Sequence, residues 1–311
     1  MDHIYAVGVG GANIDLCGRS YAPIEPRDSN PGEIEISAGG VTRNICDNLA
    51  RLGADVKLVS AVGDDLFAQI ICEQSAQAGI DVSHIYHTPG RSSSMYLAIL
   101  DNSGDMHVAL SDMHVLQNLP LDYLERKREL IANAAVVVTD PCMKAERFER
   151  VLSYCRPGQI VCVDPVSTAY ARALIPYIGQ IHTVKPNRLE LEILAGQPVD
   201  TDARLESACE TLLNRGVQRV FVSLGAEGCF YMDDTGAVLR RKLRPAKMVN
   251  ASGAGDSFAA AMLYATLQGY DAEKTLDYGM AAGIAAVTHE RTINPNMSVP
   301  LLESILQTYR L

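Results

Sequence analysis

The stretch at residues 135–184 reads AVVVTDPCMKAERFERVLSYCRPGQIVCVDPVSTAYARALIPYIGQIHTV. It places three short apolar runs, at 135–139, 160–164 and 181–184, on either side of two longer segments. Short apolar runs of this kind are typical of strands buried on both faces of a parallel sheet. Strands that alternate with helix-length segments indicate a doubly wound arrangement. The stretch therefore predicts an α/β fold.

The same alternation continues toward both ends of the 311-residue chain. Apolar runs and helical spacing predict further strands at 4–10, 57–62, 219–223, 228–232 and 237–241, and helices at 41–53, 65–79, 255–268 and 273–287. Two β-rich excursions, at about 16–38 and 91–115, interrupt the pattern, and neither can bury both of its faces on the main sheet. We expect a single α/β domain over residues 1–311, with a mostly parallel sheet flanked by helices and a small β-sheet lid formed by the two excursions.

Composition narrows the classes of function. Hydrophobic residues make up 48% and charged residues 21%, and the formal net charge is −10, which argues against polymeric nucleic acid as a partner. The eight cysteines form no C-x-x-C pair, so we expect reduced thiols. The sequence also predicts neither a signal peptide nor a membrane span, and we expect a cytoplasmic protein.

The most specific chemical signal is Asn250-Ala251-Ser252-Gly253-Ala254-Gly255-Asp256-Ser257-Phe258. Its glycines allow a tight turn, and the segment that follows is helical in character, so several N–H groups and the positive end of a helix dipole meet at one point. That point suits a phosphate. Asp256 is placed to accept the proton of an attacking hydroxyl, with Gly253, Ala254 and Gly255 as the anion hole. We expect the dipole to keep Asp256 ionised. The alternative is that Asp256 merely caps the helix.

Gly253-Ala254-Gly255-Asp256 resembles the C-terminal signature of the ribokinase-like (PfkB-type) carbohydrate and nucleoside kinases. Four further landmarks in the same order strengthen the resemblance over about residues 5–290: Gly10-Gly11-Ala12-Asn13-Ile14-Asp15, Gly39-Gly40-Val41-Thr42-Arg43-Asn44, Lys185-Pro186-Asn187-Arg188-Leu189-Glu190 and Ser223-Leu224-Gly225-Ala226-Glu227-Gly228. The resemblance implies a ribokinase-like fold and an ATP- and Mg²⁺-dependent kinase.

The resemblance also implies roles for individual residues. Those implied to hold the sugar are Asn13, Asp15, Gly39, Gly40 and Asn44, and those on the nucleotide side are Lys185, Asn187, Ser223, Gly225 and Gly228. Asn187 and Glu190 are implied to organise Mg²⁺ through water. Two alternatives stay open, because Gly39-Gly40 also suits a plain strand-to-helix turn, and Asn187 with Glu190 also suits a capping box.

Further stretches of the lid and the core read Ser29-Asn30-Pro31-Gly32, Leu110-Ser111-Asp112-Met113, Asp164-Pro165-Val166-Ser167 and Asn294-Pro295. Within that family, these stretches look like the bacterial pseudouridine kinases. On this resemblance Ser29, Ser93 and Asp112 lie over the base, with Asp112 as a buried acceptor for the additional N–H of a C-linked uracil. The alternatives are a ribokinase or another sugar or nucleoside kinase, and, from another class, a non-catalytic sugar- or nucleoside-binding protein.

Two further expectations concern cations and assembly. Many relatives carry Asp at the position of Asn250, where it helps to bind a monovalent cation such as K⁺, and Asn at this position argues against potassium activation. The alternative is a cation site lined by backbone carbonyls, which does not need the Asp. The exposed sheet edge of a small lid often pairs with another chain, so we expect a homodimer formed through the lid.

Overall fold

The computed structural model describes residues 4–244 and 246–309 and is built around a ten-stranded sheet. Its strands are β1 (Ala6–Val9), β4 (Val56–Val62), β5 (Ile80–Asp81), β6 (Ile85–His87), β9 (Val136–Thr139), β10 (Ile160–Val163), β11 (Thr183–Val184), β12 (Arg219–Ser223), β13 (Cys229–Asp233) and β14 (Val238–Arg241). They run in the order β14-β13-β12-β11-β10-β9-β1-β4-β5, with β6 paired to β4. Only the β12–β13 and β13–β14 pairings are antiparallel among these described strands. The predicted mostly parallel sheet is confirmed.

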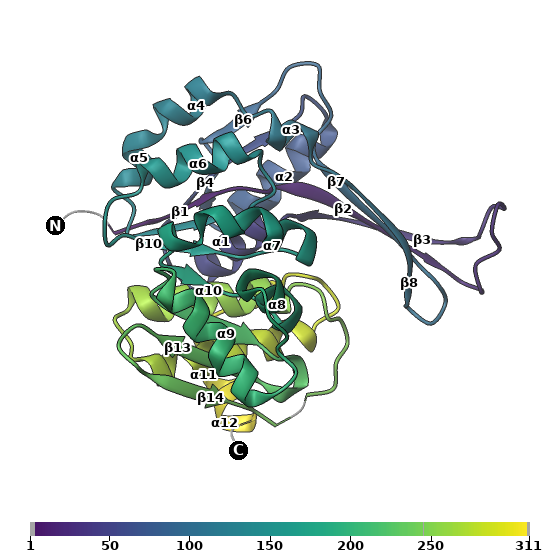
Figure 1. Ribbon diagram of the computed structural model, residues 1–311. Coiled ribbons are helices and arrows are strands. Elements are labelled where there is room, and N and C mark those ends of the chain that lie inside the picture. The colour runs from purple at the N-terminus through teal and green to yellow at the C-terminus, as the bar shows by residue number, and fades with distance from the viewer. Residues whose placement is uncertain (1–3, 245, 310–311) are drawn as a thin grey trace.

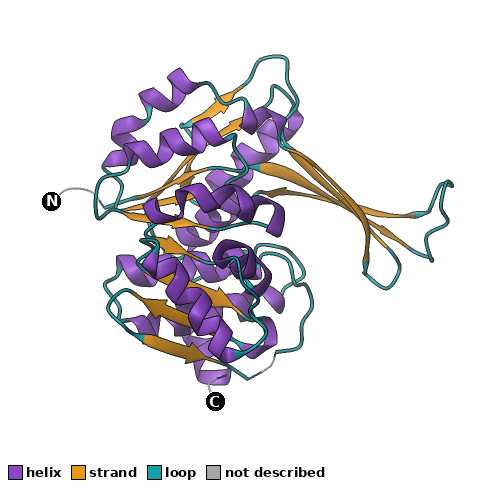
Figure 2. Cartoon of the chain, viewed as in Figure 1, coloured by secondary structure: helices purple, strands orange, loops and turns teal. Residues whose placement is uncertain are grey.

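Helices cover both faces of this sheet (Figures 1 and 2). One face carries α3 (His114–Gln117), α4 (Leu121–Arg126), α5 (Arg128–Ala132), α6 (Ala145–Tyr154), α7 (Thr168–Leu174), α8 (Arg188–Ala195) and α9 (Asp202–Asn214). The other carries α1 (Val41–Arg51), α2 (Leu66–Gln77), α10 (Ala254–Leu267) and α11 (Ala272–Val287), with α12 (Val299–Tyr309) packed on α11. Two short 3-10 helices span Ile175–Gln180 and Gly225–Glu227. None of the helices in the described ranges is long and apolar enough to cross a membrane.

The central strand β1 shows how the two layers are packed. Val7 and Val9 belong to the core under α3–α9, whereas Ala6 belongs to the core under α1 and α10, as the alternation of a strand requires. Gly8 leaves room for α1, because a Cβ at this position would lie 2.3 Å from the sulfur of Cys46. The close approach brings the first turn of α1 to the carboxyl end of β1.

A separate four-stranded sheet projects from this body as an arm (Figure 1). It consists of β2 (Asn13–Ser20), β3 (Gly32–Gly39), β7 (Met95–Leu100) and β8 (Met106–Asp112), in the order β3-β2-β7-β8. The prediction that the two excursions form one small sheet is confirmed. The strand β2 was not predicted, and it begins at Asn13, directly after the turn that ends β1, rather than at residue 16.

Candidate active site

The two glycine motifs near the N-terminus meet at the base of the arm. Gly39 ends β3, and a Cβ there would lie 2.2 Å from the carboxylate of Asp15. Gly40 has a φ of +98° and precedes α1, and a Cβ there would lie 2.5 Å from the carbonyl oxygen of Gly11. The glycine pair is a strand-to-helix turn, and it also makes the space in which Asp15 sits. Asn13 donates to the Asp15 carboxylate at 2.6 Å, while burial raises the pKa of Asp15.

Asn44, one turn into α1, reaches across to the first turn of α10. Its Nδ2 donates to Oδ2 of Asp256 at 2.9 Å. Residues that are 212 positions apart in the sequence therefore form one polar pair. The arrangement brings a residue of the N-terminal motif to the predicted general base.

Asp256 does not cap its helix. The residue that precedes α10 is Gly253, with a φ of +75°, and Asp256 is the third residue of the helix. The capping alternative is therefore wrong. A Cβ at Gly253 would lie 2.1 Å from the carbonyl oxygen of Thr292, so only glycine fits this turn. The first N–H groups of α10 lack partners within the helix, which makes them available to an anion.

The ionisation of Asp256 also departs from the expectation. Its pKa is raised to about 7, chiefly by burial and then by the charge of the neighbouring Asp164, although the hydrogen bond from Asn44 and the charge of Lys185 lower it. The helix dipole therefore does not hold this carboxyl firmly ionised. A pKa near neutrality suits a group that must take up a proton during turnover.

Lys185 brings a buried positive charge to the same place. It follows β11, and its Nζ lies 3.0 Å from the carboxylate of Asp164, which follows the neighbouring strand β10. Both side chains are buried. Burial lowers the pKa of Lys185, but the charges of Asp164, Glu190 and Asp256 outweigh burial and raise it. A Cβ at Gly255 would lie 3.1 Å from the Lys185 Nζ, so this ammonium group borders the glycine turn.

A strained turn holds Asp164. Val166 has a φ of +66°, which is rare for a β-branched residue, and Ser167 N donates to Pro165 O at 2.7 Å across it. The Asp164 carboxylate accepts from Val166 N at 2.8 Å. Backbone strain of this kind costs about 1–3 kcal/mol and is concentrated at functional sites. Sequence reasoning assigned no role to Asp164.

Asn187 and Glu190 form a complete capping box at the start of α8. Glu190 N donates to Asn187 Oδ1 at 2.9 Å, and Asn187 N donates to Glu190 Oε2 at 2.8 Å. The structural alternative is thus present. Glu190 is buried, and burial raises its pKa. Over residues 4–244 and 246–309, no group of three or more His, Cys, Asp or Glu side chains is spaced to hold a metal ion.

The remaining nucleotide-side motif lies beside the capping box. Ser223, at the end of β12, pairs with Asn187 in a parallel bridge, and its N donates to Pro186 O at 3.0 Å. The following turn contains Gly225, with a φ of +59°, and Gly228, with a φ of +95°. The motifs at 185–190 and 223–228 are therefore neighbours, at the carboxyl ends of adjacent strands.

The residues expected over the base are dispersed. Asp112 is exposed and its carboxylate accepts from the His114 backbone N–H and ring, so the expectation of a buried acceptor is wrong. Strand pairing also puts Asp112 in register with Ile14, one position from Asp15, and therefore on the opposite face of the arm. Ser29 is exposed in the loop between β2 and β3, at the far end of the arm (Figure 1).

Ser93 is buried where the arm joins the body. Its hydroxyl donates to Asp65 Oδ1 at 2.7 Å and accepts from Gly63 N at 3.0 Å. Both hydrogen-bonding directions of this side chain are already used. A contact with a nucleoside base through the Ser93 hydroxyl would require these bonds to open.

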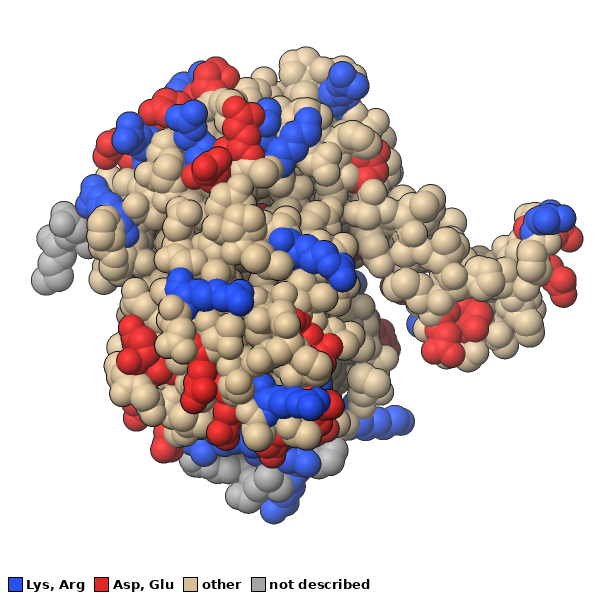
Figure 3. Space-filling model, in the orientation of Figure 1, with Lys and Arg blue, Asp and Glu red and all other residues tan. Residues whose placement is uncertain are grey.

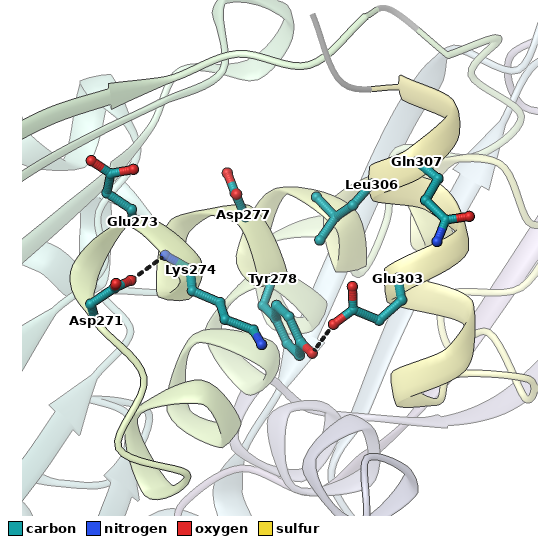
Figure 4. Close-up of a pocket in the computed structure, with 8 residues that line it drawn as sticks. All are labelled: Asp271, Glu273, Lys274, Asp277, Tyr278, Glu303, Leu306 and Gln307. Atoms are coloured by element: carbon teal, nitrogen blue, oxygen red, sulfur yellow. Dashed lines mark hydrogen bonds between the residues drawn. The ribbon is translucent and has the colours of Figure 1, made fainter.

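A pocket on the body lies apart from all these residues. It is lined by side chains at and after the start of α11 and on α12 (Figure 4). Tyr278 donates to Glu303 across it, and Lys274 lies over the Tyr278 ring. It contains none of the residues that the sequence singled out.

Comparison with known proteins gives a consistent answer. A family model described as pfkB family carbohydrate kinase matches residues 4–299. The pseudouridine kinase of Escherichia coli K12 is 34% identical over 303 residues, covering 97% of this chain and 96% of that protein. The guanosine-inosine kinase of Exiguobacterium acetylicum is 29% identical, covering 93% of this chain and 96% of that protein. A crystal structure of a putative sugar kinase from Clostridium perfringens superimposes with a TM-score of 0.88 at 34% identity, covering 99% of this chain and 97% of that one.

Proposed function

Since the chain belongs to the pfkB family of carbohydrate kinases, we propose that it transfers the γ-phosphoryl group of ATP to the 5′-hydroxyl of pseudouridine. Membership of the family makes it a phosphotransferase with an alcohol acceptor, an ATP-dependent sugar or nucleoside kinase. The choice of pseudouridine is supported by likeness to a pseudouridine kinase over 97% of the chain.

The observation that carries the proposal is Asp256 at the start of α10, between the Asn44 amide and the charge of Lys185. In the proposed reaction the acceptor oxygen attacks the γ-phosphorus, and the Asp256 carboxylate takes the hydroxyl proton. The bond from the γ-phosphorus to the oxygen that bridges it to the β-phosphate breaks, and ADP leaves with that oxygen. The N–H groups of Gly253–Gly255 and the Lys185 ammonium stabilise negative charge on the transferred group.

The nucleotide side of the site is proposed to lie along the motifs at 185–190 and 223–228. Ser223, Gly225 and Gly228 form a turn against β12 and β13, beside Asn187. Asn187 and Glu190 would hold Mg²⁺ through water, and when bound this ion neutralises phosphate charge. The burial of the Glu190 carboxylate and its charge near Lys185 support this assignment.

On the acceptor side, Asp15, Gly39, Gly40 and Asn44 are proposed to hold the ribose. The glycine pair leaves the Asp15 carboxylate accessible at the base of the arm. For the base we propose Tyr96 and Ser111 in place of Asp112. These two residues are in register with Asp15 and share its face of the arm sheet.

A substrate panel tests the assignment. ADP release would be measured with pseudouridine, uridine, ribose, adenosine and inosine, using the wild-type chain and Asp256→Asn. We expect pseudouridine to be preferred and Asp256→Asn to bind it normally while losing about 10²–10⁴ in rate. Equal turnover of uridine and pseudouridine would contradict the substrate, and near-normal turnover by Asp256→Asn would contradict the general base.

A second candidate is a purine nucleoside kinase. It is favoured by the likeness to a guanosine-inosine kinase over 93% of the chain. Inosine in the panel distinguishes the two candidates. A chain that binds nucleosides but releases no ADP with any acceptor would instead be a non-catalytic binding protein.

We also propose a homodimer formed through the arm. One face of the arm sheet bears two adjacent apolar rows, and it lies opposite the face that bears Asp15. The rows of paired residues on it are Ile36-Leu16-Leu97-Leu110 and Ile34-Gly18-Ile99-Val108. The exposed Asp112 lies on the same face, at the base of the arm. Ile34, Ile36, Val108 and Leu110 are exposed, and Figure 3 shows few charged side chains along the stem of the arm. The exposed apolar rows suit the same face of a second copy, because a two-fold interface is self-complementary.

A further inference from the structure

Arg43 is a buried charge next to the site that the proposed reaction does not use. It precedes Asn44 in α1, and its side chain is 3% exposed. Its guanidinium contacts Asp47, donates to the Ser75 hydroxyl at 3.2 Å and donates to the Ala38 carbonyl at 3.1 Å. A long cationic side chain is almost never buried unless it is paired in this way.

One further contact of Arg43 points to the site. Its Nη1 donates to Oδ1 of Asn44 at 3.2 Å, while Nδ2 of the same amide donates to Asp256 at 2.9 Å. We propose that Arg43 is a positioning residue that fixes the orientation of the Asn44 amide and thereby directs its NH₂ group to the Asp256 carboxylate. The proposal rests on the proposed role of Asp256 as the general base.

The chemistry of the three groups sets the direction of the chain of bonds. A guanidinium has donors and no acceptor, so the atom of Asn44 that faces it must be the carbonyl oxygen. The NH₂ group must then face Asp256, which as a carboxylate has acceptors only. An amide that is free to rotate by 180° would instead present its oxygen to the carboxylate and repel it. Arg43 excludes that orientation.

Nη1 of Arg43 also contacts the arm. Nη1 of Arg43 carries two hydrogens, and it donates to both Asn44 and the carbonyl of Ala38 in β3. The backbone N–H of Ala38 donates to Oε1 of Gln74, in α2, at 3.1 Å. The last residues of β3, which lead into Gly39 and Gly40, are therefore held in a fixed relation to the Asn44 amide.

The substitution that tests this role is Arg43→Lys. Lysine keeps the positive charge near Asp47 but has one nitrogen in place of a planar fork, so it cannot reach all the partners of Arg43 together. The other groups that face Asp256, which are Asp164, Lys185 and Asp15, stay in place. A change in the titration of Asp256 would then report the lost hydrogen bond and not a lost charge.

The titration can be followed directly in the complete chain without any substrate. Aspartate labelled with ¹³C at the side-chain carboxyl gives the Asp256 signal by NMR, identified by its absence from Asp256→Asn. A hydrogen bond to a carboxylate favours the ionised form, so we expect Arg43→Lys to raise the midpoint by about one pH unit. The acid limb of kcat/KM for pseudouridine should move in the same direction.

Two controls separate positioning from a general disturbance. Ser75→Ala removes another partner of Arg43 and should lower the unfolding temperature without moving the Asp256 midpoint. Asn44→Ala should raise the midpoint as Arg43→Lys does, and the two together should raise it no further than either alone. If Arg43→Lys fails to fold, Arg43→Met with Asp47→Asn removes both buried charges together and is titrated in its place.

A folded Arg43→Lys variant that titrates like the wild type would overturn the proposal. A shift that adds fully to that of Asn44→Ala would also overturn it, because Arg43 would then act by another route. The proposed function fails separately: if Asp256→Asn keeps normal turnover, Asp256 is not the base, whatever the NMR titration of Asp256 shows in the Arg43 variants.

Discussion

At the scale of single residues, the site is a balance of buried charges. Asp164 and Asp256 raise the pKa of Lys185, while Lys185 and Asn44 limit the rise of the pKa of Asp256. Each group is buried enough that its charge depends on its neighbours. The proposed base is therefore tuned near neutrality by residues from four different segments of the chain.

The raised pKa of Asp256 predicts how activity depends on pH. The base is competent when ionised, and its pKa is about 7, so it is ionised above that pH and protonated below it. We expect kcat/KM to fall about tenfold per pH unit below pH 7 and to level off above it. A pH profile between 5 and 9 checks this expectation. A flat profile down to pH 5 would contradict it.

The same shift predicts a stability effect of opposite sign. Between the unfolded value of 3.8 and about 7, the folded chain binds the Asp256 proton more tightly than the unfolded chain does. Stability contributed by this proton is therefore present at low pH and is lost as pH rises through 7. We expect Asp256→Asn to raise the free energy of unfolding at pH 8 by roughly 1–2 kcal/mol, with no gain below about pH 4.

Chemical denaturation at the two pH values measures this difference. Asp112→Asn is the matched control, because hydrogen bonds from His114 lower the pKa of that exposed carboxyl. Its removal should not stabilise the protein at pH 8. If Asp256→Asn instead destabilises the protein at pH 8, burial of the ionised Asp256 carboxylate does not lower the free energy of unfolding.

Asn250 predicts independence from potassium. Its Nδ2 donates to the carbonyl of Glu290 at 2.8 Å, and its Oδ1 accepts from Ser252 N at 2.9 Å. The neutral amide of Asn250 thus occupies a carbonyl oxygen that could otherwise coordinate a cation. We expect turnover to be unchanged when Na⁺ replaces K⁺ at constant ionic strength, and Asn250→Asp to become K⁺-dependent. Loss of wild-type activity without K⁺ would contradict this interpretation.

At the scale of elements, α8 combines a structural and a proposed chemical role in one residue. Glu190 closes the capping box with Asn187, and it is also proposed to help hold Mg²⁺. Glutamine can close a capping box as glutamate does, but it carries no charge. Substitution at this position can therefore separate the two roles.

We expect Glu190→Gln to keep the wild-type unfolding temperature and to need more Mg²⁺ for half-maximal rate. Glu190→Ala should lose the cap as well and destabilise the protein by about 0.5–2 kcal/mol. Thermal unfolding and a Mg²⁺ titration of ADP release measure the two effects. An unchanged Mg²⁺ requirement in Glu190→Gln would leave the capping box as the function of this residue.

Elements that carry a continuous apolar run or a helical period could be predicted from the sequence, and elements that carry neither could not. The helix at α10 agrees with its prediction within a residue at each end, because a glycine turn precedes it and its apolar run is continuous. By contrast β2 carries Asp15, Gly18 and Arg19 and lacks an apolar run, since one of its faces is polar. The two-residue β5 has too few residues to show any period.

The candidate site residues also divide into those that the sequence motifs identified and those that they did not. Asp256, Asn44 and Lys185 lie in motifs, and the structure brings them together. Asp112 was misplaced because its face depends on the register between β7 and β8, which one residue of slip reverses. Asp164 and Arg43 were assigned no role, because the contacts that link them to the site, with Lys185 after β11 and with Ala38 in β3, join segments that are separate in the sequence or lie in different elements.

At the scale of the whole molecule, the fold gathers these motifs at one edge. The candidate residues follow β1, β10, β11 and β12, and the carboxyl ends of parallel strands share an edge of the sheet. The arm begins at the same place, because β2 starts and β3 ends there, with Asp15 in β2 and Gly39 in β3. An arm that is rooted at the site but extends beyond the body needs support along its apolar face.

We expect a second copy of the chain to cover the apolar face of the arm. Ile36→Lys with Leu110→Lys places two charges on the exposed apolar face of the arm, in one row of paired residues. We expect the wild type to be a dimer by sedimentation equilibrium and the double variant to be a monomer, because burying unpaired charges at the centre of an apolar interface is unfavourable. Glu35→Lys is the matched control, since Glu35 lies on the opposite face of β3, and it should remain a dimer. A monomeric wild type would contradict the proposed interface, and a dimeric double variant would place the interface elsewhere on the molecule.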